Sequence, residues 1–142
     1  FLRTIREGLI AGVDPGVALA ITGDMNLVGH SRPLKTLVEG DIVNESLFGP
    51  DRPLDSDGSP LKNVLPRLTE RPLSYTWRSD GGSYWPSHID YIILSDALLL
   101  ANKAVVLDTR EMGDDALSRH GLLSTDSQAS DHLLTWADLR PR

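Results

Sequence analysis

The sequence predicts an α/β (α+β) fold in a single domain. Apolar residues recur at helical spacing over residues 1–13, and the apolar run that follows indicates a buried strand over 17–23. Two further apolar runs, at 89–94 and 103–108, are typical of buried strands. A chain of 142 residues, 40% of them hydrophobic, is long enough for one domain with a modest core.

The first part of the chain indicates a helix, a strand and a second helix. The Asp-Pro-Gly sequence at 14–16 is expected to end the first helix and to turn the chain into the strand. Beyond that strand, Ser31 is placed to cap a helix over 32–39. Residues 41–43 are expected to form a short strand or to lead into one.

The middle of the chain, residues 49–72, is rich in Gly, Pro, Asp and Ser and is expected to be a long irregular loop. The run from Asp55 to Gly58 is similar to a calcium-binding loop. It lacks the terminal glutamate at the required spacing, so a solvated acidic turn is the better interpretation. Residues 74–77 are rich in β-branched and aromatic side chains and predict a strand.

The last part of the chain adds a helix and a final strand. The helix is expected over 114–121, where a glycine ends it, and an alternating pattern predicts the strand over 133–139. Polar side chains stand at the strand ends at 24–26, 90 and 131–132. We expect these strand ends to meet at one edge of the sheet.

Composition limits the classes of function. The formal net charge of −6 disfavours a broad, non-specific hold on nucleic acid, although a local basic groove remains open. Cysteine is absent, which excludes disulfides, thiolate metal sites and a cysteine nucleophile. The sequence has no run of about 18 apolar residues, so no membrane span is expected.

Two polar side chains close the first strand. Asp24 and Asn26 are two residues apart, so they point to the same side as long as the backbone stays extended. A carboxylate and an amide together can hold a water or a phosphoryl oxygen. A polar turn, in which both side chains bond their own backbone, explains the same residues equally well.

A carboxylate also stands within the apolar run at 89–94, where Asp90 is the second residue. Burial of an unpaired carboxylate costs several kcal/mol, so Asp90 is expected to have a partner. A local bond to a backbone N–H or to Tyr91 is one possible partner.

Three short motifs together resemble those of one superfamily. They are Gly-Asp-x-Asn at 23–26, Ser-x-Ile-Asp-Tyr at 87–91 and Ser-Asp-His at 130–132, in that order along the chain. In this respect the chain is similar to the endonuclease/exonuclease/phosphatase superfamily of metal-dependent phosphoesterases. A Tyr-Thr-Trp sequence at 75–77 lengthens the resemblance. Each motif is common singly, and their order is what makes the resemblance specific.

The resemblance implies half of a four-layer α/β sandwich, with a mixed, mostly antiparallel sheet and flanking helices. The superfamily's N-terminal motifs, including a metal-binding glutamate, have no counterpart here. On this resemblance, residues 1–142 are expected to correspond to the C-terminal part of one such domain, with the N-terminal part absent. One face of the sheet is expected to be uncovered unless the missing half or a second copy covers it.

The resemblance also implies roles for individual residues. Asp24 would orient a water and accept its proton, Asn26 would donate to that water or to a phosphoryl oxygen, and Asp90 would orient His132. His132 would stabilise the transition-state oxyanion when protonated. Asp131 would bind Mg²⁺, or Mn²⁺ in its place, directly or through a water.

The function implied is hydrolysis of a phosphodiester or phosphomonoester bond in a substrate of unknown class. Because the metal-binding glutamate is missing, the 142 residues alone are expected to be inactive. Tyr84 and Trp85 are candidates for substrate contact by stacking, although packing over the sheet edge is favoured for such aromatic residues. A non-catalytic ligand-binding or interaction domain on the same scaffold is the alternative function.

Overall fold

The computed structural model describes all residues from Phe1 to Arg142 and has an α+β fold with two three-stranded sheets. The first sheet has the strand order β1-β4-β2, with both pairs antiparallel, and comprises Ala20–Asp24, Asp90–Leu94 and Lys62–Val64. The second sheet has the order β3-β5-β6 and comprises Arg67–Leu68, Leu99–Leu107 and Leu134–Pro141. In it, β3 is parallel and β6 antiparallel to β5. The predicted fold class is confirmed.

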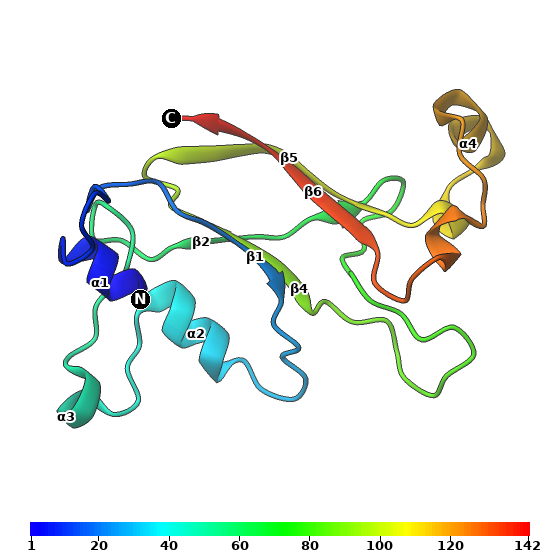
Figure 1. Cartoon of the computed structure of the whole chain (residues 1–142). Coiled ribbons are helices and arrows are strands. Elements are labelled where there is room, and N and C mark those ends of the chain that lie inside the picture. Colours follow the sequence, from blue (N-terminus) through cyan, green and yellow to red (C-terminus); the bar gives the residue numbers. More distant parts are fainter.

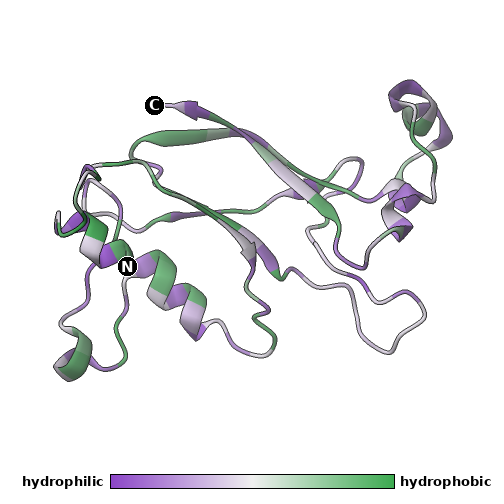
Figure 2. Ribbon diagram, in the orientation of Figure 1, coloured by the Kyte–Doolittle hydropathy of each residue, from purple (hydrophilic) through white to green (hydrophobic).

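The two sheets pack face to face, and Figure 1 shows β5 and β6 above β1 and β4. Buried Val64, Ile92 and Leu94 of the first sheet pack against Ala104 and Ala137 of the second. The opposite face of the first sheet packs against α2 (Arg32–Glu39) through Leu34, Leu37 and Val38. Figure 2 shows hydrophobic and hydrophilic residues alternating along α2, as expected of a helix with one buried face.

The outer face of the second sheet is covered only in part. Val105 pairs with Trp136 and Leu107 with Leu134, so these four side chains share that face. Leu134 is 64% exposed and Trp136 is 37% exposed. Together with Leu68, Met112 and Leu122, three of these residues line a cavity of about 490 Å³. This apolar sheet face is therefore open to solvent on its β6 side, whereas Val105 is buried and Leu107 packs against Met112 and Leu117.

Several predicted elements are present where the sequence places them. The helix predicted over 32–39 is α2, and the one predicted over 114–121 is α4 (Asp114–His120). Each ends at a glycine with a left-handed backbone, Gly40 (φ 74°) and Gly121 (φ 64°). β4 is the central strand of its sheet, which explains why four of its five residues are buried and apolar.

The first helix is much shorter than predicted. α1 covers only Leu2–Arg6, because Gly8 (φ 70°) and Gly12 (φ 77°) take left-handed conformations that turn the chain where the apolar spacing predicts a helix. β1 begins at Ala20 rather than at residue 17. The predicted strand over 41–43 is absent, and a short helix, α3 (Glu45–Phe48), follows instead, capped by the side chain of Asn44.

The loop predicted over 49–72 contains two short strands, β2 and β3. Asp55 in this loop is not solvated as expected. It is 4% exposed, and its Oδ2 accepts a hydrogen bond from the backbone N–H of Ala97 at 3.0 Å. Residues 74–77 form no strand, since Trp77 makes only isolated bridges, with Ser87 and His132. None of the helices combines the length and apolar character that crossing a membrane would require.

Candidate active site

Strand pairing brings two carboxylates together. Asp24 is the last residue of β1 and Asp90 is the first residue of β4, and the antiparallel register pairs them directly. Paired residues project to the same side of a sheet. The polar ends of the two strands therefore meet at one edge, as expected from the sequence.

His132 reaches both carboxylates from the segment before β6. Its Nδ1 lies 3.1 Å from each carboxylate oxygen of Asp90, and its Nε2 lies 4.0 Å from Oδ2 of Asp24. The partner of Asp90 is thus His132, since the hydroxyl of Tyr91 donates instead to the carbonyl of His88. Because Asp90 engages Nδ1, Nε2 is the nitrogen that faces Asp24 and solvent.

The surroundings of His132 favour its protonated form. The hydrogen bond that Nδ1 donates to Asp90 is the main cause of a raised pKa of His132. Partial burial opposes this rise, and the charges of Asp90, Asp24 and Asp131 add to it. An imidazolium at this position would present one N–H to Asp90 and the other to the space beside Asp24.

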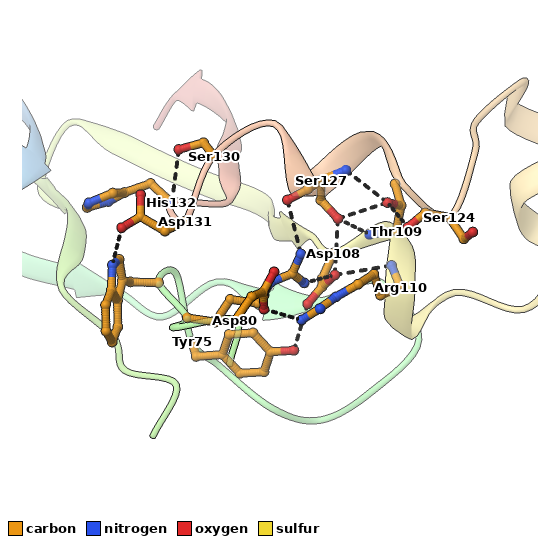
Figure 3. Close-up of polar contacts among 12 residues, drawn as sticks. Tyr75, Asp80, Asp108, Thr109, Arg110, Ser124, Ser127, Ser130, Asp131 and His132 are labelled. Carbon is orange, nitrogen blue, oxygen red and sulfur yellow. Dashed lines mark hydrogen bonds and ion pairs between the residues drawn. The ribbon is translucent and has the colours of Figure 1, made fainter. Parts of the chain in front are cut away.

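Asp131 is fixed by the indole of Trp77. Its Oδ2 accepts a hydrogen bond from Trp77 Nε1 at 2.9 Å, as Figure 3 shows, and its carbonyl accepts one from the N–H of Arg78 at 3.0 Å. The indole hydrogen bond is the main cause of the lowered pKa of Asp131, which keeps the carboxylate ionised. Asp131 is exposed and accessible to a ligand.

The backbone at Asn26 is not extended. The prediction that the side chains of Asn26 and Asp24 point to the same side required an extended backbone. β1 ends at Asp24, and Asn26 has a φ of 45°, the only positive φ of a residue other than glycine. Its backbone N–H donates to Oδ1 of Asp24 at 2.7 Å, so the polar turn, the alternative that the sequence equally allows, is present for Asp24. The exposed side-chain amide of Asn26 makes no hydrogen bond within the chain.

Tyr84 and Trp85 lie in the loop that the Trp77–Ser87 bridge closes. They are 75% and 86% exposed, so the favoured expectation that they pack over the sheet edge is wrong. Neither side chain has a hydrogen bond or ring contact with the other candidate residues. The structure therefore leaves them as free aromatic surface.

Thr76 connects two segments of the site, although its position in the sequence predicts no such role. It is fully buried, and its hydroxyl accepts the backbone N–H groups of Ile89 at 3.1 Å and Asp90 at 2.9 Å. Its carbonyl accepts the N–H of Leu133 at 2.7 Å. Thr76 thus joins the start of β4 to the residue after His132. A hydroxyl between two aromatic residues was the only signal in the sequence.

The chain offers hard oxygen donors but no complete metal site. Carboxylates such as those of Asp24 and Asp131 suit Mg²⁺ or Mn²⁺. No group of three or more His, Asp or Glu side chains is arranged to hold a metal ion. The residues present could therefore supply part of a coordination shell and not all of it.

A scan against protein-family models and searches of curated proteins and of solved structures found no match to this chain.

Proposed function

We propose that this chain carries the histidine and carboxylates of a divalent-metal-dependent phosphoesterase of the endonuclease/exonuclease/phosphatase type. One observation carries the proposal. Asp90, His132 and Asp24, each from a different motif, are neighbours, with 3.1 Å between Asp90 and Nδ1 of His132 and 4.0 Å between Nε2 and Asp24. Water attack on a phosphoryl group is assisted by a carboxylate that accepts a proton from the water and by a donor to the developing negative charge, and these three residues offer both.

The residues at this site have separate roles in the proposed reaction. Oδ1 of Asp24 is engaged by the N–H of Asn26, so Oδ2 is the oxygen available to accept a proton from the attacking water. As the water oxygen bonds to phosphorus and the leaving oxygen departs, negative charge grows on the phosphoryl oxygens. Nε2 of protonated His132 can donate to that charge, and the amide of Asn26 is free to assist.

In this proposal Mg²⁺, or Mn²⁺, neutralises charge on the phosphate when it is bound. Asp131 is the residue of this chain that would hold it, directly or through a water. The remaining ligands would come from the substrate, from water and from the N-terminal part of the domain that the resemblance implies. The open face of the second sheet, with exposed Leu134 and Trp136, supports a covering partner of this kind or a second copy.

The experiment that tests the proposal is hydrolysis of a panel of phosphodiesters and phosphomonoesters in Mg²⁺ by the product of the whole gene. We expect turnover that EDTA abolishes and that His132→Ala reduces. Residues 1–142 alone should be inactive, because their metal ligands are incomplete. A folded whole product that hydrolyses none of the panel would contradict the proposal.

A non-catalytic ligand-binding domain on the same scaffold is the second candidate. The absence of a three-ligand metal cluster is the observation that favours it. Binding of a phosphate ester that is weakened by Asn26→Ala, without turnover in Mg²⁺ or Mn²⁺, would support this function instead.

A further inference from the structure

We propose that the buried ion pair between Arg78 and Asp108 is a positioning device that holds Asp131 and His132 in place. The placement of these two residues can be measured without any activity. Its effect on turnover rests on the function proposed above.

The pair is almost inaccessible to solvent, with exposed fractions of 2% for Arg78 and 1% for Asp108. Nη1 of Arg78 forms an ion pair with Oδ1 of Asp108, and Nε lies 3.2 Å from Oδ1 of Asp80. A buried ion pair often contributes no more to stability than apolar side chains of the same size. Stability alone therefore explains it poorly.

Arg78 contacts the segment that carries Asp131 and His132 at two points. Its backbone N–H donates to the carbonyl of Asp131 at 3.0 Å, and its Nη2 donates to the carbonyl of Ser127 at 3.0 Å. The preceding residue, Trp77, donates its indole N–H to Asp131 and forms the bridge to His132. Residues 77–78 thus hold both ends of the segment 127–132.

Asp108 holds the same segment from the other side, at the end of β5. Its Oδ1 accepts the hydroxyl of Ser127 at 3.1 Å, and its Oδ2 accepts the hydroxyl of Tyr75 at 2.8 Å. Two further hydrogen bonds join Thr109 to Ser127. The backbone N–H of Thr109 donates to the hydroxyl of Ser127 at 2.8 Å, and the backbone N–H of Ser127 donates to the hydroxyl of Thr109 at 3.0 Å. Figure 3 shows this group of contacts around Asp108.

Ionisation of Asp108 is maintained within this cluster. Burial raises the pKa of Asp108, but hydrogen bonds from Arg78 and Tyr75 and the charge of Arg78 bring it below its ordinary value. The segment 129–133 has no helix or strand of its own beyond the bridge at His132. Backbone pairing with residues 76–78 holds the segment only at 131–133. The charged cluster anchors the start of the segment 127–132, at Ser127.

The indole N–H resonance of Trp77, assigned with Trp77→Phe, reports the hydrogen bond to Asp131. We expect Arg78→Met to move this resonance toward its position in a solvated indole, and Arg78→Lys to restore it in part. The double variant Arg78→Met/Asp108→Leu leaves no unpaired buried charge. We expect this double variant to recover the melting temperature but not the position of the Trp77 indole resonance. If the ion pair only stabilised the fold, both would recover together.

Ile93→Ala is the matched control, since Ile93 is fully buried and its core cluster contains neither the ion pair nor a residue of the segment 127–132. It should lower the melting temperature and leave the Trp77 resonance in place. Should Arg78→Met not fold, Ser127→Ala replaces it, and the same displacement is expected. An unmoved resonance in the folded variant, or an equal shift in Ile93→Ala, would overturn the proposal.

In a protein that turns over a phosphate ester, Arg78→Met should lower kcat at least 10-fold with a smaller change in KM. If no ester is turned over, the resonance experiment still decides the placement of Asp131. The failure of the phosphoesterase function and the failure of this positioning role are therefore separate outcomes.

Discussion

His132 is held at one ring nitrogen by Asp90 and faces Asp24 with the other, so its titration should report the site directly. In metal-free protein we expect a pKa above the ordinary value of 6.5, measured from the ring resonances by NMR. Asp90→Asn should lower it clearly. Asp24→Asn should lower it less, because Asp24 lies at 4.0 Å and Asp90 at 3.1 Å. A titration that Asp90→Asn leaves unchanged would contradict the described contact.

The raised pKa has a consequence for stability. Since the folded state binds the proton more tightly than the unfolded state, the contribution of His132 is fully present below pH 6.5 and is lost as the pH rises through the higher, folded value. Urea unfolding across that window should therefore show a smaller pH dependence in Asp90→Asn than in the parent protein.

The contacts of some site residues could be predicted from the sequence, and those of others could not. The pairing of Asp90 with His132 followed from the motifs and agrees with the geometry. The turn at Asn26 did not follow, because the sequence equally allows an extended strand end and a local hydrogen bond. Thr76 and Arg78 act through backbone groups of distant residues, and such contacts leave no pattern in the sequence around them.

The hydroxyl of Thr76 is the contact that fixes where β4 begins. Thr76→Val keeps the shape and leaves the buried N–H groups of Ile89 and Asp90 without an acceptor. We expect a loss of about 1–3 kcal/mol in the free energy of unfolding, measured by denaturant titration. Thr76→Ser keeps the acceptor and should lose less. Equal stability of the two variants would show that the hydroxyl is not needed.

The end of α2 depends on the missing side chain of Gly40. Its φ is 74°, and an added Cβ would lie 2.0 Å from the carbonyl oxygen of Arg52. Gly40→Ala should cost about 2 kcal/mol or more, by strain and by collision. Gly58→Ala is the control, because Gly58 has a similar φ of 81° with open space around it. It should cost only about 1 kcal/mol.

Helices and strands with a strong, uninterrupted pattern were predictable. The amphipathic α2, the buried β4 and the glycine-terminated α4 are of this kind. The pattern misled over residues 1–13, where apolar spacing continues past glycines that turn the chain. The pattern also predicted a strand at 74–77 that is absent. There Tyr75 and Thr76 make side-chain hydrogen bonds to distant residues, and Trp77 forms only isolated bridges.

The entire chain exposes one apolar sheet face, and this should be visible in solution. We expect residues 1–142 to bind a hydrophobic dye or to self-associate, because Leu134 and Trp136 are unshielded. Trp136→Gln should reduce both effects in dye-binding and sedimentation measurements. Trp85→Gln is the control, since Trp85 is 86% exposed but does not line the cavity on that face. A monomeric chain without dye binding would contradict this expectation.

The fold class followed from the sequence, but the two separate sheets did not, because strand partners are set by contacts between distant residues. The short strands β2 and β3 lie in a segment rich in turn-forming residues, where no periodicity marks them. Their positions are fixed by β4 and β5, to which they pair.

The most direct test of the proposed mechanism is a double-variant cycle on Mg²⁺-dependent turnover, with Asp90→Asn, His132→Ala and both together in the product of the whole gene. Because Asp90 is proposed to act through His132, each single variant should lose about 10²–10⁴-fold in kcat, and the double variant should be little worse than His132→Ala. Losses that multiply, or turnover that survives His132→Ala, would contradict the proposal that Asp90 and His132 act as one unit.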